Sequence, residues 1–76
     1  MKDTEAIAQV IEELNVARQN YAPMNSDHEG YAVILEEFDE VWEEIKKRPY
    51  QKDRNLIRAE MKQVAAMALR FMIDLC

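Results

Sequence analysis

Residues 26–49 read SDHEGYAVILEEFDEVWEEIKKRP. Apolar residues recur in this stretch every three or four positions, the spacing that places side chains on one face of an α-helix. These residues are Tyr31, Ile34, Leu35, Phe38, Val41, Trp42 and Ile45. Ser26 and Glu29 have the spacing of a capping box, in which the Ser26 hydroxyl accepts from the Glu29 amide and the Glu29 carboxylate accepts from the Ser26 amide. Pro49 stops the pattern, so we predict a helix over about residues 27–48.

Helical patterns lie on both sides of this stretch. Ile7, Val10, Ile11, Leu14 and Ala17 predict an amphipathic helix over about residues 3–21, which ends before Pro23. Asp53 is a suitable N-terminal cap for another helix over about residues 53–75. The connection between the second and third helices is short, so we expect these two helices to be antiparallel neighbours.

The composition favours one small helical domain. The chain has 76 residues, 49% of them hydrophobic, with one glycine and two prolines, which disfavours turn-rich sheets. We therefore predict an all-α fold, with residues 1–76 forming a single domain. The third helix has apolar residues on two sides, and three helices do not easily cover both. We expect a four-helix-bundle core that is completed by oligomerisation, as a homodimer or a tetramer.

The charge and the apolar segments exclude several classes of partner. Fifteen acidic and ten basic residues give a net charge of −5, the wrong sign for binding duplex nucleic acid or anionic lipid. The most apolar stretch, residues 64–76, contains Arg70 and Asp74 and is shorter than the ~20 residues of a membrane span. Cys76 is the only cysteine and cannot form an internal disulfide, so we expect a reducing, cytoplasmic location.

The acidic residues of the second helix are the most informative feature for function. At 100° per residue, Glu37, Glu40 and Glu44 lie on one strip, and no lysine or arginine occurs in this helix before Lys46 to reduce their repulsion. On the third helix, Glu60 lies among apolar residues of one face. A lone carboxylate there is costly to bury unless it is protonated, paired or bound to a cation.

Antiparallel packing would bring Glu37 and Glu40 opposite Glu60. Carboxylate oxygens are preferred ligands of Mg²⁺ and Mn²⁺, which makes a divalent cation the natural neutraliser of this cluster. Two alternatives stay open: Glu40 belongs to a solvated acidic face, or Glu60 forms a buried ion pair with Lys46 or Arg58 of a neighbour.

Other side chains have weaker functional interpretations. Lys62 and Arg70 are able to bind phosphates, but we expect an exposed ion pair for each. Phe38 and Trp42 have the spacing of packing residues, and we expect them in the helical core rather than stacked on a base.

The acidic motif also resembles a known family. The pattern EExxE occurs as Glu36, Glu37 and Glu40, and Glu60 follows about twenty residues later. Together with the surrounding words HEGYAVILEE and QVAAMALRFMIDL, it resembles the MazG-like, all-α nucleoside triphosphate pyrophosphohydrolases, over about residues 27–75. The resemblance implies Mg²⁺-dependent cleavage of a nucleoside triphosphate between the α and β phosphates, in an oligomer with a four-helix core. It makes Glu37 and Glu40 metal ligands, gives Glu36 a supporting role, and makes Glu60 the first acid of the second motif, ExxD.

The chain departs from the family at Gln63, where the family has aspartate. An amide oxygen is able to ligate Mg²⁺ but adds no negative charge, so we expect weaker metal binding. One hypothesis is a pyrophosphohydrolase with Glu36, Glu37, Glu40 and Glu60 as catalytic residues and Gln63 as a further metal ligand. The alternative is a catalytically inactive helical module for dimerisation or partner binding. A third interpretation is binding of a basic partner through the acidic face.

Overall fold

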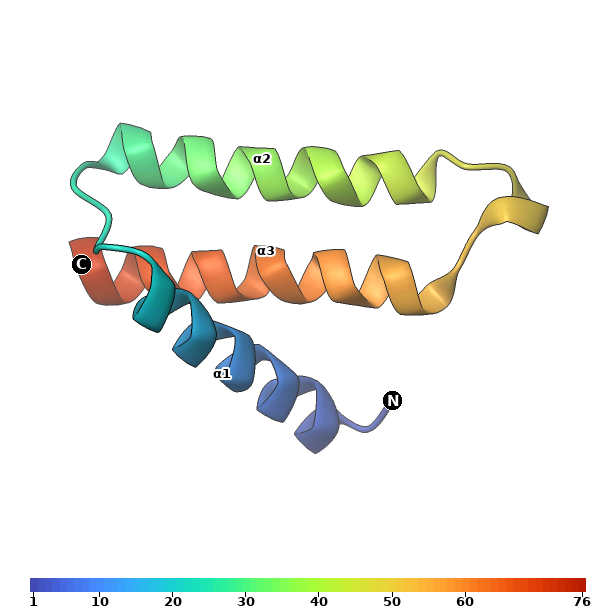
Figure 1. The fold of residues 1–76 in the computed structure, drawn as a ribbon, viewed down its shortest axis with the longest axis horizontal. Coiled ribbons are helices and arrows are strands. Elements are labelled where there is room, and N and C mark those ends of the chain that lie inside the picture. The colour runs from blue at the N-terminus through green and yellow to red at the C-terminus, as the bar shows by residue number, and fades with distance from the viewer.

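The structure is a computed structural model that describes residues 1–76 and consists of helices and short connections (Figure 1). Helix α1 spans Asp3–Asn20, α2 spans Asp27–Ile45, and α3 spans Arg54–Leu75. A short 3-10 helix, η1, spans Pro49–Gln51 between α2 and α3. The predicted all-α fold is confirmed. None of the helices combines the length and the apolar character that crossing a membrane requires.

The helix ends follow from a few local interactions. Helix α2 ends at Ile45 rather than at the predicted Arg48, because the residue before a proline is pushed out of the helical region and Arg48 is extended. At the start of α2, the Ser26 hydroxyl accepts from the Glu29 backbone N–H at 3.1 Å, as predicted. The other half of the predicted capping box is wrong. The Glu29 carboxylate accepts from the backbone and side-chain N–H groups of Asn25, which offers two donors to one oxygen.

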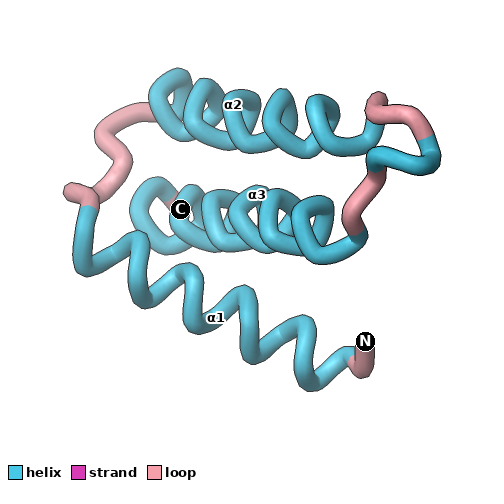
Figure 2. The backbone as a smooth tube through the Cα atoms, turned by 45° about the vertical axis from the view of Figure 1, so that its right-hand side comes forward, coloured by secondary structure: helices cyan, strands magenta, loops and turns pink.

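Helix α3 lies in the middle of the molecule. The Asp53 side chain caps it by accepting from the Asn55 backbone N–H at 2.8 Å, as predicted. Helix α2 runs antiparallel beside α3, and α1 crosses α3 obliquely on the other side (Figures 1 and 2). No Cα atom of α1 approaches one of α2 within 8 Å. Helix α3 therefore has a partner helix on each of two sides within one chain, but Met61, Met72 and Ile73 of α3 stay 45–62% exposed. Completion of the bundle by a second copy stays a prediction.

The core is small and lies where the C-terminal half of α1 meets α3. It consists of Leu14, Ala17, Met24, Ala66 and Met67. Only nine of the 76 residues are buried, and no large side chain is completely buried. Gly30 lets α2 approach α3 closely, since a Cβ atom there would lie 2.5 Å from a ring carbon of Phe71. This close approach lies at the end of the interface that is formed by the start of α2 and the C-terminal end of α3.

The apolar residues of α2 form two neighbouring stripes, and only one of them faces α3. The stripe with Gly30, Ile34 and Val41 is buried or half-buried against α3. The other stripe is exposed and consists of Tyr31, Leu35, Phe38, Trp42 and Ile45. Phe38 and Trp42 are 51% and 57% exposed, so our expectation that they pack in the core is wrong for the single chain. The physical reason is that the packing of Gly30 and Val41 against α3 sets the rotation of α2 about its own axis. Consecutive residues of a helix are about 100° apart around that axis, so the residue after each of these two lies on the exposed stripe.

Candidate metal centre

The interface between α2 and α3 contains glutamates at positions where apolar residues are usual. On α2, Glu37 lies on the α3-facing stripe between Ile34 and Val41. On α3, Glu60 lies on the stripe that also carries the buried Val64. Residues three and four positions apart share one face of a helix, so the packing that buries these apolar neighbours also draws both glutamates toward the interface.

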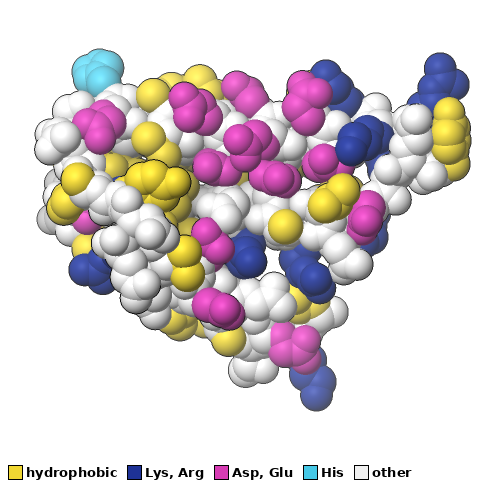
Figure 3. All heavy atoms as spheres, in the orientation of Figure 1, with side chains coloured by type: hydrophobic (Ala, Val, Ile, Leu, Met, Phe, Trp, Pro, Cys, Tyr) yellow, Lys and Arg dark blue, Asp and Glu magenta, His cyan; other side chains and the backbone are white.

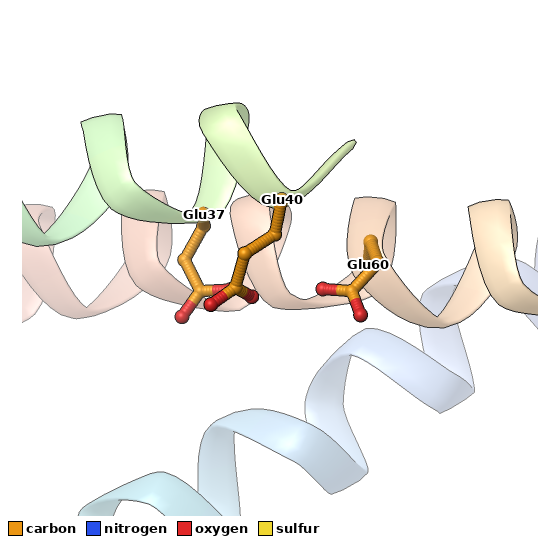
Figure 4. A group of neighbouring side chains, drawn as sticks. All are labelled: Glu37, Glu40 and Glu60. Carbon is orange, nitrogen blue, oxygen red and sulfur yellow. The ribbon is translucent and has the colours of Figure 1, made fainter. Parts of the chain in front are cut away.

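The structure brings three of the predicted site residues together: Glu37 and Glu40, one turn apart on α2, lie opposite Glu60 of α3 (Figure 4). One carboxylate oxygen from each of Glu37, Glu40 and Glu60 lies within 4.8 Å of the others. Glu37 and Glu60 are half-buried, and Glu40 is exposed. We call these three side chains the acidic cluster. The acidic side chains also gather along α2 on the face that Figure 3 shows.

The acidic cluster has no cation from the chain. No lysine or arginine nitrogen lies within 4.0 Å of its carboxylates, since the ion pairs of the structure are Lys46–Glu43, Lys47–Glu44 and Lys62–Glu13. Within the chain, Glu60 therefore makes no ion pair with Lys46 or Arg58. With all three carboxylates ionised, no donor group reaches the buried Oε2 atom of Glu37. The cluster is left with uncompensated negative charge.

Burial and this uncompensated charge make Glu37 and Glu60 harder to ionise. Burial raises the pKa of Glu37 to about 7, with further contributions from repulsion by and hydrogen bonding with Glu40, and from the charges of Glu60 and Glu36. Burial also raises the pKa of Glu60, and hydrogen bonding with Glu40, repulsion by Glu40 and the charge of Glu44 act in the same direction. The cluster thus meets neutral pH either partly protonated or with a bound cation.

The chemistry of the cluster suits a hard divalent cation. Oxygen ligands that share one Mg²⁺ or Ca²⁺ lie at about 2.0–2.6 Å from the ion, so they are separated by about 3–5 Å from one another. The carboxylate oxygens of Glu37, Glu40 and Glu60 are already within this range. Three carboxylates on one side of an ion leave its other positions open to water or phosphate oxygens.

The two other predicted site residues, Glu36 and Gln63, line a cavity that Glu37 of the cluster also lines. The cavity has a volume of about 580 Å³ and lies between α1, the connection of residues 21–25, α2 and α3. Glu36, Glu37 and Gln63 all line it. Glu36 is exposed and Gln63 is half-buried. Gln63 is therefore close enough to share the environment of Glu37, one turn along α3 from Glu60.

One residue of this cavity, Arg70, differs from its predicted environment. Lys62 forms the expected ion pair, with Glu13 at 3.8 Å, and it is half-buried. Arg70, by contrast, lies buried in the cavity wall and makes no ion pair, so the expected exposed pair is wrong. Its burial depends on residues 21–25, which fold over α3 and are held there by a hydrogen bond from the Met24 N–H to the Asp74 carboxylate at 2.9 Å. No local pattern in the sequence indicates this contact.

Comparisons with known proteins add no relative to this picture. No protein-family profile matches the chain, and neither a curated protein nor a solved structure matches it.

Proposed function

We propose that the chain is a Mg²⁺-dependent nucleoside triphosphate pyrophosphohydrolase, which cleaves the linkage between the α and β phosphates to give a nucleoside monophosphate and pyrophosphate. The observation that carries the proposal is the acidic cluster of Glu37, Glu40 and Glu60, whose oxygens lie within 4.8 Å of one another without a cation from the chain. The adjoining cavity of about 580 Å³ has the size of a small-molecule site.

The residues have distinct roles in this proposal. Glu37, Glu40 and Glu60 hold the cation, with Gln63 as a further neutral oxygen ligand. When bound, Mg²⁺ or Mn²⁺ supplies positive charge that neutralises the phosphates and polarises their phosphorus–oxygen bonds. A water oxygen forms a bond to one phosphorus of the linkage, and the bond from that phosphorus to the bridging oxygen breaks. Glu36, exposed at the cavity beside Glu37, is our candidate for accepting the proton of the water.

The choice of substrate depends on the resemblance to the MazG-like family, since the cluster alone fits many phosphate reactions. Glu36, Glu37 and Glu40 match EExxE, and Glu60 matches the first acid of ExxD, while Gln63 departs from it. We place the activity in a reducing cytoplasm, which suits the free and exposed Cys76.

Release of pyrophosphate from nucleoside triphosphates tests this function. We expect release in the presence of Mg²⁺ and none after chelation. Glu37→Ala and Glu60→Ala should each reduce the rate by about 100-fold or more, because they remove charge that holds the cation at the phosphates. Glu43→Ala is the matched control, since Glu43 is an exposed glutamate of α2 outside the cluster. Full activity in both cluster variants would contradict the assignment.

A second candidate is a catalytically inactive module that associates through helices. The exposed stripe of α2 favours it, because Tyr31, Phe38 and Trp42 are each more than half exposed on one helix face. A second copy of the chain is the partner that we propose, and self-association is compatible with the enzyme as well. Light scattering should give a mass above 9.0 kDa that falls toward the monomer in Trp42→Lys. Tyr50→Lys, at an exposed tyrosine of η1, should leave the mass unchanged.

A further inference from the structure

Arg70 is the one charged residue among the buried residues of the chain, with a side chain that is 6% exposed. Its Nη2 atom donates to the Ala22 carbonyl oxygen at 2.9 Å, and its Nη1 atom contacts the Met67 sulfur at 3.5 Å. The Nε–H group is buried and has no acceptor. No carboxylate oxygen lies within 4.0 Å of the guanidinium.

Such a guanidinium is poorly satisfied by the protein alone. Arginine stays charged in proteins, and a buried charge requires partners for most of its five N–H donors. One carbonyl oxygen and one thioether sulfur are too few hydrogen-bond acceptors for a buried guanidinium. Asp74, one turn further along α3, is the nearest candidate on the same helix, but its carboxylate accepts from the Met24 N–H instead. Arg70 therefore keeps donors for a group that comes from outside the chain.

The cavity next to the acidic cluster is where that group would enter. Arg70 is the only cationic residue of its wall, which also contains Tyr21, Asn25 and Glu29. The guanidinium carbon of Arg70 lies 5.9 Å from the centre of the Tyr21 ring. Gln63, beside the cluster, and Arg70 are seven residues apart on α3, which corresponds to about 10 Å along the helix. The cavity thus connects an acidic end with an end that offers an aromatic ring and arginine donors.

We propose that the Arg70 end of this cavity binds the base of the nucleotide, and that Arg70 selects bases with acceptor atoms on one edge, guanine above all. This inference rests on the proposed function, in which the phosphates lie at the acidic cluster. A base fits better than a phosphate at this end, because the Glu29 carboxylate beside Asn25 repels anions, and the acidic cluster that would hold an offsetting cation lies at the other end. Arginine donates in parallel to O6 and N7 of guanine, whereas adenine presents an N–H₂ donor at the position of O6.

Binding of guanosine and adenosine monophosphates tests the inference without requiring turnover. Calorimetry on the whole chain should show GMP binding about tenfold more tightly than AMP, in line with the discrimination of one bidentate arginine contact. In Arg70→Lys, which keeps the charge and loses the planar fork, the two affinities should become equal. Lys62→Met, a change on the same helix outside this cavity, should keep the preference.

The possible results separate this inference from the proposed function. Equal binding of GMP and AMP by the unchanged chain, or binding of neither, would overturn the inference whatever the variants do. A preference for GMP that persists in Arg70→Lys would also overturn the role of Arg70. Pyrophosphate release without base preference would contradict the inference alone, and preferential GMP binding without any pyrophosphate release would support the base site and contradict the hydrolase.

Discussion

Two pairs of glutamates on helix α2 differ in their counter-ions, because only the pair near the C-terminal end of the helix has lysine partners. Glu43 pairs with Lys46 at 2.9 Å, and Glu44 pairs with Lys47 at 2.7 Å. Glu40 and Glu37, about one and two turns earlier, have no cation within 4.0 Å. The residues are of one type on one helix, so the difference lies in what surrounds them.

The surroundings differ because α2 has its lysines only after its last turn. A lysine reaches glutamates three or four positions away, which covers Glu43 and Glu44 but not the earlier pair. What α3 brings to Glu37 and Glu40 is a further carboxylate, that of Glu60. Lysines of the chain therefore neutralise Glu43 and Glu44, whereas the acidic cluster requires protons or an added cation.

The largest effect that we expect from the difference between the two pairs is a pH dependence of the free energy of unfolding in the metal-free chain. The pKa of Glu37 is raised from 4.5 to about 7 in the folded chain, so folding favours its protonated form. This stabilisation is complete below the unfolded value and is lost as the pH rises through about 7. We expect thermal unfolding in EDTA to show a loss on the order of 2 kcal/mol between pH 5 and pH 8.

Glu37→Gln is the control for this pH dependence, because it keeps the shape of the side chain and removes the charge. Its stability should change much less over the same pH range. A metal-free chain that becomes more stable from pH 5 to pH 8 would contradict the account of the cluster.

The helices and the acidic cluster were predictable, and the reasons are local. Ser26 and Asp53 mark helix starts, and Glu60 among apolar neighbours indicates a carboxylate at an interface. The rotation of α2 was not predictable from periodicity, because its two apolar stripes differ by a single position. Gly30 is the signal that could have indicated the α3-facing stripe, since a Cβ atom there would force the Phe71 ring to move. Arg70 was missed because long cationic side chains are usually exposed.

A smaller effect is expected when the missing acid of the second motif is supplied. Gln63→Asp adds a fourth carboxylate beside Glu37, so Mg²⁺ affinity should rise by about tenfold, or ~1.4 kcal/mol, as a charged ligand replaces a neutral one. Without metal, the same variant should be less stable at pH 8 because the repulsion increases. Gln51→Asp, at an exposed position of η1, is the matched control and should change neither property. Unchanged Mg²⁺ affinity in Gln63→Asp would exclude Gln63 from the coordination of the cation.

The smallest effect concerns the neutralised pair. Lys47→Gln removes the partner of Glu44, and we expect a loss of only about 0.5 kcal/mol in the free energy of unfolding, typical of a pair three residues apart on a helix surface. Mg²⁺ affinity, measured by calorimetry, should rise by less than about threefold, because the freed charge of Glu44 acts on the cluster only through repulsion of Glu60. A change of about tenfold or more would show that Glu44 takes part in holding the cation, and the distinction between the two pairs would fail.

The most direct test of the central claim is a calorimetric titration of the chain with Mg²⁺ at pH 8, repeated with Mn²⁺ and with the Glu60→Gln variant. We predict binding of one cation per chain at millimolar metal or below, a rise of the unfolding temperature with metal concentration, and affinity at least about tenfold weaker in Glu60→Gln. Absence of heat and of thermal stabilisation in the unchanged chain, or equal binding by the variant, would contradict it.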